Sequence, residues 1–384
     1  MSLESLQQAA GAVFTERNGV RVPLHFGQPA EEHLASRKNI LMVDYSHFGI
    51  VEVQGDDAYD FLNRVVAGDL SVIRNEQALY TLLLNDKGQI ATDLYLLCDD
   101  ERFLLISEWM RGDKLAASLQ ALIGDDDVQV ASQDNSLTTT LFEGPYCWEL
   151  MAELFGFDVL GLPFMEFMRV DDDAILLRAG KHGEFAFKVL TTKEGAADLW
   201  QRASEAGVKF DMKQGGLDFQ SKSRLENPCW DPALVGEFSR CPIELQMQWA
   251  VRYDKDEFIG RDALLAKLEQ GCKQRVVGFV VKGDGAALTI GDSLFSGDQE
   301  IGKVITLGHS VGVDGYIGQA LIDSDYAYAG IDQYEIAGNG ARVAISTSAI
   351  PFLQNFSFMV NPAEHSYVDA SRPKSLIEQL QAKA

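Results

Sequence analysis

The character of the sequence changes at Arg275. From there on, short β-rich runs alternate with glycines, as in QRVVGFVV, EIGKVITL, IGQALID and ARVAIST. Short strands at close spacing are typical of a small all-β barrel or sandwich. The helical pattern before them breaks in LEQGCKQ, so we expect a linker near residues 268–274. We therefore predict a C-terminal β-barrel domain over 275–360 and a C-terminal tail over 361–384.

Residues 1–270 have a different pattern, in which helical and strand-like segments alternate. Helical composition over 30–39 precedes the alternating run ILMVDYSHFGIVEVQG, and 56–66 again has helical spacing. ALYTLLLN and QIATDLYLL then flank Asp86-Lys87-Gly88, which is typical of a hairpin turn. RFLLIS and the helical DKLAASLQALI follow, and two more strands over 174–190 precede another helix. This order predicts two α+β units with antiparallel sheets.

Length and charge narrow the class of protein. The 384 residues are enough for two or three domains. A formal net charge of −24, from 33 Lys+Arg and 57 Asp+Glu, repels phosphate backbones and anionic lipid headgroups. No stretch of 18 apolar residues and no signal-peptide pattern occurs. We therefore expect a cytoplasmic protein with no nucleic-acid or membrane partner.

Metal and nucleotide sites have no support in the sequence. The five cysteines form no Cys-x-x-Cys pair, and the six histidines are isolated from one another. A lone histidine such as His33 or His47 is more often a packed, hydrogen-bonded residue than a catalyst. There is also no Walker loop and no Gly-x-Gly-x-x-Gly motif. We expect no metal ion.

Asp93 is the most informative single residue. It interrupts QIATDLYLL, a strand that is otherwise apolar on both faces. A buried carboxylate needs partners and can serve as a general base or as an anchor for an amine. The alternative is a strand end that emerges into water, and the pattern leaves both open.

Three other residues leave alternatives open. Arg224 precedes Glu226 by two positions, which suits either a surface ion pair or a guanidinium that binds a ligand carboxylate. Trp230 and Trp249 could floor a slot for a flat heterocycle, or they could pack in a core.

Several of these segments occur in an order that is typical of one family. The opening VPLHFGQPAEEHLASRKNILMVDYSHFG and the hairpin ALYTLLLNDKGQIATDLYLL are followed by TLFEGP, LPFM, SRLE, CPIELQMQWAV, KDEFIGRDALL, IGKVITLG and IPF. From about Val22 to Phe352 the chain resembles the aminomethyltransferase (T-protein) of the glycine cleavage system. The resemblance implies a cloverleaf of three modules around a central channel. Residues 1–270 would then form a folate-binding region of two interleaved α+β modules.

The resemblance also implies roles for particular residues. Asp93 falls on the family's essential carboxylate, which acts on the N5 region of tetrahydrofolate. Tyr80, Arg224 and Trp249 fall on residues that surround the folate. The implied cofactor is tetrahydrofolate, and the implied partners are a small one-carbon donor and a lipoyl carrier protein.

Two family motifs are altered here. Arg-x-Gly-Tyr-Thr-Gly-Glu-x-Gly-Phe-Glu becomes the segment from Arg178 to Lys188, in which Lys181 replaces the tyrosine and Lys188 the glutamate that reads the pterin. A lysine has three donors and no acceptor, so it cannot replace that glutamate. SEWM stands where the family has Asn-Ala-x-Asn, which places Glu108 and Trp109 there. Glu108 could supply the missing acceptor.

These departures favour a relative with another one-carbon donor, such as a sulfonium, a methylated amine or a methoxy aromatic. For a cationic donor, Trp109 or Tyr95 could provide a cation–π face. The sequence thus predicts a folate-dependent aminomethyltransferase or methyltransferase (demethylase). Two alternatives remain. One is a non-catalytic folate-binding protein related to iron–sulfur-cluster assembly factors, although their Lys-Gly-Cys-Tyr-x-Gly-Gln-Glu signature is absent. The other is a family member that has lost folate and binds another ligand.

Overall fold

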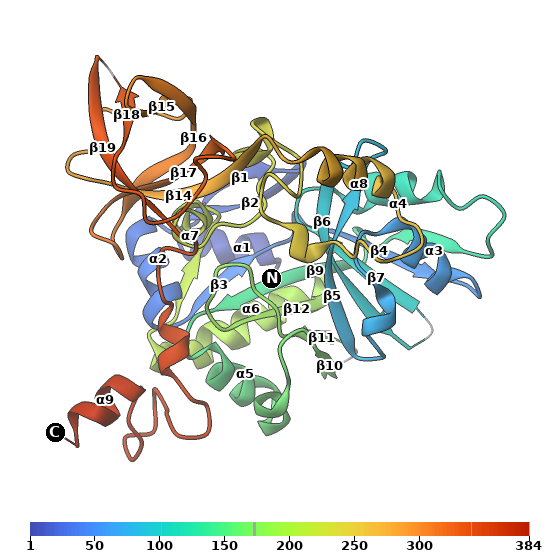
Figure 1. Ribbon diagram of the computed structural model, residues 1–384. Helices are drawn as coiled ribbons and strands as arrows, with labels where there is room; N and C mark the ends of the chain where they lie inside the picture. Colours follow the sequence, from blue (N-terminus) through green and yellow to red (C-terminus); the bar gives the residue numbers. More distant parts are fainter. Residues whose placement is uncertain (101, 172–173, 339, 384) are drawn as a thin grey trace.

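Two open sheets and a closed barrel organise the chain in a computed structural model, which describes residues 1–100, 102–171, 174–338 and 340–383 (Figure 1). The barrel lies at the upper left of Figure 1 and the five-stranded sheet at the right, while the C-terminal tail projects at the lower left. Within the described residues, no helix is long and apolar enough to cross a lipid bilayer.

The first sheet has five antiparallel strands. In sheet order they are β5 (Gln77–Leu84), β6 (Ile90–Asp99), β7 (Arg102–Ser107), β4 (Gly49–Gln54) and β8 (Gln129–Ser132). The predicted hairpin is confirmed, since β5 and β6 are antiparallel neighbours and Gly88 has a φ of +67° in their turn. The helices α3 (Ala58–Val65) and α4 (Gly112–Gln120) share an apolar core with one face of this sheet.

The second sheet has six strands drawn from distant parts of the chain. In sheet order they are β10 (Phe167–Val170), β11 (Ala174–Leu177), β12 (Ala186–Thr192), β9 (Leu137–Glu143), β3 (Leu41–Asp44) and β13 (Lys213–Gly215). The expected antiparallel pairing holds except at one edge, where β13 runs parallel to β3. Helices α5 (Cys147–Phe155) and α6 (Lys193–Gly207) share an apolar core with one face.

The two sheets pack against each other through their remaining faces. Leu141 and Leu177 of the six-stranded sheet belong to the same core cluster as Tyr95 and Leu97 of β6. Because side chains alternate along a strand, Tyr95 and Leu97 face this shared interior, whereas Leu94 and Leu96 contribute to the core beneath α3 and α4.

The predicted small C-terminal barrel is confirmed. Its six strands close in the order β14 (Gln274–Val281), β17 (Gly315–Asp323), β16 (Gln299–Ser310), β15 (Ser293–Ser296), β18 (Tyr334–Gly338) and β19 (Ala341–Ser348). Three residues separate β14 from the preceding helix α8 (Arg261–Gln270), and Gly271 among them has a φ of +79°.

The remaining elements connect these bodies. They are α1 (Leu3–Ala9), the β1–β2 hairpin (Val13–Arg17 and Val20–His25), α2 (Pro29–Lys38), α7 (Asp218–Glu226), α9 (Leu376–Gln381) and the 3-10 helices η1 (Leu70–Val72), η2 (Phe157–Gly161), η4 (Val208–Phe210), η5 (Val235–Glu237), η6 (Gln248–Ala250) and η7 (Phe356–Met359). Helix α7 packs on α2 and on the barrel strand β16. It therefore links the N-terminal part of the chain to the barrel.

Candidate functional site

Asp93 lies in the middle of β6 and is fully buried. Its odd position on the strand directs it into the interior between the two sheets. A strand end that emerges into water is therefore excluded. Burial of a carboxylate at this point requires partners.

Two side chains bind the same oxygen of Asp93. Tyr80 lies on the neighbouring strand β5, where it pairs in register with Tyr95 of β6. Its hydroxyl donates to Asp93 Oδ2 at 2.7 Å. Lys181 donates its ammonium to Oδ2 at 2.6 Å. The other oxygen, Oδ1, is buried and accepts no hydrogen bond from the described residues. A donor of a ligand or a water could use this acceptor.

Glu108 is a second buried carboxylate, joined to Asp93 through Lys181. Lys181 Nζ lies 3.3 Å from Glu108 Oε2, while Arg224 and Gln220 donate to Oε1. Burial alone would raise the pKa of Glu108, but the charges of Arg224 and Lys181 hold this pKa well below its usual value. Glu108 is thus ionised, and its acceptor capacity is largely used within the protein.

Lys181 is held as a permanent cation. Burial would lower its pKa, yet the carboxylates of Asp93 and Glu108 raise it above the ordinary value. The same burial and the nearby Asp93 charge raise the pKa of Tyr80 well above its usual value, so its hydroxyl stays a donor.

The loop that carries Lys181 is fixed from several sides. Asn227 donates to the Lys181 carbonyl at 3.1 Å, and Arg37 donates to the His182 carbonyl at 2.9 Å. The His182 ring binds Glu143 at 2.8 Å. Gly183 has a φ of +85°, and a Cβ there would lie 1.7 Å from Asn355 Nδ2. The loop therefore positions Lys181 before any ligand binds.

Arg224 corrects one sequence interpretation. It is buried and pairs with Glu108 and, at 3.1 Å, with Asp231 rather than with Glu226. Residues two apart on a helix such as α7 do not face each other, and Glu226 instead pairs with Arg37 at 3.1 Å. The surface ion pair is thus wrong, and the guanidinium binds carboxylates of the protein itself.

Lys188 lies in the middle of β12 and is only 2% exposed. Among the described residues it makes one hydrogen bond, to the Ala179 carbonyl at 2.7 Å, and no ion pair. Its Nζ lies 4.6 Å from the centre of the Tyr95 ring. Burial, reinforced by the charge of Lys181, lowers the pKa of Lys188 to about 7.

An aromatic pair connects Asp93 to the surface. The Trp249 ring, on η6, stacks on Tyr80 at 5.3 Å with an interplanar angle of 21° and is 69% exposed. Trp230 is 1% exposed and packs in a core with Val276 of the barrel. The exposed Trp249 ring is therefore available to a flat ligand, whereas Trp230 packs in a core.

The rings predicted to meet a cationic donor already carry cations of the protein. Arg224 and Arg17 lie 5.0 and 5.4 Å from the centre of the Trp109 ring. Lys181 lies 6.0 Å from the Tyr95 ring centre, in addition to Lys188.

Sequence reasoning found most of this network and missed part of it. Direct contacts link Asp93, Tyr80, Lys181, Glu108 and Arg224. Trp249 and Tyr95 contact Tyr80, and Trp109 contacts Arg224. Lys188 contacts Tyr95. Gln220 and Asp231 were missed. Gln220 precedes Arg224 by four positions, so helical spacing could have found it. Asp231 carries no such signal.

Thiol or metal chemistry has little support at this network. Burial raises the pKa of Cys229 to about 11, and all five cysteines are free. Burial also lowers the pKa of His47 to about 3. No group of three or more potential ligands that could hold a metal ion occurs among the described residues.

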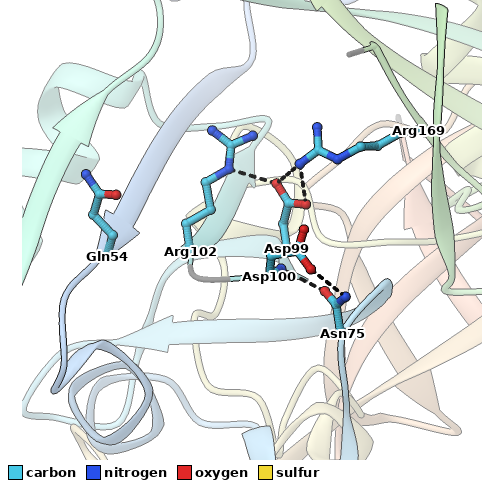
Figure 2. Close-up of a pocket in the computed structure, with 6 residues that line it drawn as sticks. All are labelled: Gln54, Asn75, Asp99, Asp100, Arg102 and Arg169. Atoms are coloured by element: carbon cyan, nitrogen blue, oxygen red, sulfur yellow. Dashed lines mark hydrogen bonds and ion pairs between the residues drawn. The ribbon is translucent and has the colours of Figure 1, made fainter.

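A separate hollow of about 750 Å³ lies at the far end of β6 (Figure 2). Asp99 accepts from Arg102 at 2.7 Å and from Arg169 at 2.6 and 2.9 Å. Asn75 and Asp100 bind each other (Figure 2). Because these polar groups bind one another, we assign no chemistry to the hollow.

The fold is that of a glycine cleavage aminomethyltransferase T. The solved structure of the aminomethyltransferase T from Bartonella henselae matches this chain with a TM-score of 0.78 and 24% identity. The match covers 92% of this chain and 98% of the Bartonella henselae chain. Family models agree, because the GCVT N-terminal domain matches residues 3–255 and the glycine cleavage T-protein C-terminal barrel domain matches residues 274–354. The chain belongs to the glycine cleavage T-protein family.

Two of the similar curated relatives are aminomethyltransferases. An aminomethyltransferase of Thermoanaerobacter pseudethanolicus is 30% identical over 334 residues, which cover 83% of this chain and 87% of the relative. An aminomethyltransferase of Lysinibacillus sphaericus is 29% identical over 358 residues, covering 89% and 94%. The expected family membership is thus confirmed.

Proposed function

We propose that the protein is a tetrahydrofolate-dependent one-carbon transferase, which moves a methyl or aminomethyl group from a small donor to tetrahydrofolate. The observation that carries the proposal is the state of Asp93. One of its oxygens is held by Tyr80 and Lys181, while the other is a buried acceptor without a partner among the described residues. The relatives named aminomethyltransferase support the same reaction class.

The residues fit part of a reduced pteridine. The stacked Trp249 and Tyr80 rings offer a face for a flat heterocycle, and Oδ1 of Asp93 can accept a hydrogen bond from a ring N–H. Lys188 does not fit the edge of that ring that carries several N–H donors. Its amine already donates to the Ala179 carbonyl and does not offer the two acceptors that these N–H groups need. Glu108 is largely occupied, so it is a weak substitute.

Asp93 would act by holding the nucleophilic nitrogen of tetrahydrofolate in line with the one-carbon group. A carboxylate that accepts the N–H hydrogen bond can also take the proton as the new N–C bond forms. The bond from that carbon to the heteroatom of the donor breaks at the same time, and the donor leaves with its electron pair. Lys181 and Tyr80 fix its orientation, so that proximity and alignment contribute much of the rate. A lipoyl carrier protein is a second proposed partner, as the source of an aminomethyl group.

The test of this proposal is the substitution Asp93→Asn. It keeps the shape of the side chain but removes the proton acceptor, so turnover with tetrahydrofolate should fall by about 10²-fold or more. Asp86→Asn is the matched control, because Asp86 is exposed in the turn of the same hairpin. Thermal unfolding of both variants checks that the fold is intact. Normal turnover by a folded Asp93→Asn protein would reject the assignment.

A second candidate is a family member that binds another ligand in place of folate. It is favoured by Lys188, which opposes the expected hydrogen-bond pattern at a buried position. Calorimetric titration with tetrahydrofolate separates the two, since only the first function predicts binding. A non-catalytic folate-binding protein would bind tetrahydrofolate but show no turnover with any methylated donor.

A further inference from the structure

Two lysine side chains approach one aromatic ring in the interior between the sheets. Lys188 Nζ lies 4.6 Å and Lys181 Nζ lies 6.0 Å from the centre of the Tyr95 ring. Lys181 comes from the fixed loop before β12, and Lys188 comes from β12 itself. The two amines belong to the same small region as Asp93.

Within the described part of the chain, only one of these lysines has a counter-ion. Lys181 bridges Asp93 and Glu108, whereas Lys188 has only the Ala179 carbonyl among the described residues. A buried ammonium without an anion costs free energy that an apolar side chain in the same place would not cost. Two of the three N–H donors of protonated Lys188 therefore have no acceptor among the described residues.

Glu143 is the carboxylate whose charge raises the pKa of Lys188 most, so it is the first candidate for an internal counter-ion. It lies on β9, next to β12, and Lys188 pairs in register with Leu141, two residues before it. Its Oε2 is bound by His182, and its Oε1 has no partner among the described residues. The two groups form no ion pair, so the charge of Lys188 is unmatched at contact distance.

We infer that Lys188, with Lys181 beside it, binds a carboxylate of the one-carbon donor. The inference rests on the proposed function and narrows its substrate class to donors that bear a carboxylate. A monoanion suits the region better than a dianion, because Asp93 and Glu108 are already present as negative charges. A sulfonium or quaternary ammonium donor is disfavoured, because Arg224 already lies over the Trp109 ring and the Lys181 cation over the Tyr95 ring.

The pKa of the Lys188 amine gives this role a measurable consequence. With a pKa of about 7, the Lys188 amine is largely neutral above that pH when no anion is bound beside it. A carboxylate would favour its protonated form, as Glu143, Glu108 and Asp93 do at longer range and as Lys181 opposes. Binding of an anionic donor at pH 8 should therefore take up a proton.

The experiment compares acids with their amides on the full-length protein. The probes are N-methylglycine against N-methylglycinamide and 3-methoxybenzoate against 3-methoxybenzamide, titrated by calorimetry at pH 8 in buffers of different ionisation enthalpy. For at least one pair the wild type should bind the acid about tenfold more tightly than the amide, with proton uptake. Lys188→Met should lose the preference and the uptake, while Lys188→Arg should keep the preference.

The exposed Lys193→Met, five residues further along the chain, is the matched control and should behave as wild type. If Lys188→Met does not fold, Lys188→Gln replaces it. Equal acid-to-amide ratios in the wild type and in a folded Lys188→Met or Lys188→Gln variant would overturn the inference. So would a loss of tetrahydrofolate binding in Lys188→Met with unchanged binding of 6-methyltetrahydropterin, because the carboxylate would then be that of folate.

Failure of this inference and failure of the proposed function give different results. Tetrahydrofolate binding and Asp93-dependent turnover without any Lys188-dependent acid preference would refute only the carboxylate subsite. An acid preference that depends on Lys188, in a protein that binds no tetrahydrofolate, would support the subsite and refute folate transfer.

Discussion

At the scale of single residues, the candidate site is a balance of buried charges. Asp93 and Glu108 share Lys181, and Arg224 joins Glu108 to Asp231. Each of these five groups has an opposite charge within contact distance. Lys188 has none among the described residues, so it should leave a signature in the stability of the protein.

The stability of the wild type relative to Lys188→Met should depend on pH. The pKa of Lys188 is lowered from 10.5 to about 7, so the unfolded chain binds more protons between these values and stability rises with pH there. The destabilisation by Lys188 is complete below about pH 7 and disappears as pH approaches 10.5. We expect Lys188→Met to be more stable than wild type by a few kcal/mol at pH 6 and by much less at pH 10.

Urea unfolding of both proteins at pH 6, 8 and 10 measures this difference. A difference in the free energy of unfolding that is the same at all three pH values would contradict the assigned burial of the Lys188 amine.

At the scale of elements, strand alternation and one loop decide where the chemistry lies. The alternation of β6 turns Asp93 towards the six-stranded sheet, and α7 presents Gln220 and Arg224 on one face. The loop between β11 and β12 supplies Lys181. It is fastened by side chains from α2, from β9 and from the segments after α7 and after the barrel.

Gly183→Ala should destabilise this loop. Gly183 has a φ of +85°, and the added Cβ would lie 1.7 Å from Asn355 Nδ2, so both backbone strain and a clash oppose the change. Gly19→Ala is the control, because Gly19 has a φ of +72° but no atom within 4 Å of an added Cβ. We expect a loss of about 1 kcal/mol for Gly19→Ala and a clearly larger loss for Gly183→Ala.

Denaturant unfolding measures both losses. The Gly183→Ala protein should also lose turnover, since Lys181 would no longer be held in place. Equal effects of the two substitutions would show that the loop tolerates displacement.

At the scale of the whole molecule, Glu226 joins the barrel to the N-terminal part. It is buried at the end of α7 and accepts from Ser310 on β16 at 2.8 Å, while Arg37 and His33 of α2 bind its other oxygen. The contact spans three elements that are distant in the sequence. Its loss should loosen the barrel.

Glu226→Gln should cost roughly 3 kcal/mol of stability, because it leaves the buried Arg37 without its main counter-charge. Cleavage by a protease in the 271–273 segment before the barrel should become faster. Glu31→Gln is the control, since Glu31 pairs with Lys213 at the surface and should cost less than about 1 kcal/mol. An unchanged rate of proteolysis in Glu226→Gln would show that Glu226 does not hold the barrel against the N-terminal part.

Some features of the fold and the site could be predicted from the sequence, and others could not. The hairpin of β5 and β6 followed from its turn residues, and the barrel followed from its short Gly-punctuated strands. Asp93 stood out because a charged residue in an apolar strand is costly. For Arg224 the sequence left a surface ion pair with Glu226 as one of two alternatives, and this one is wrong. Its partners Glu108 and Asp231 are 116 and seven positions away, and only the fold brings them together.

The amino-acid sequence by itself determined the local elements, the family and the identity of the charged residues that enter the interior. These depend on spacing along the chain, where periodicity and turn chemistry act over a few residues. The tertiary structure decided which charges meet. It places Lys181 between Asp93 and Glu108 and gives Lys188 no anion among the described residues. The pairing of buried charges depends on strand order and loop closure between distant segments, which local patterns do not encode.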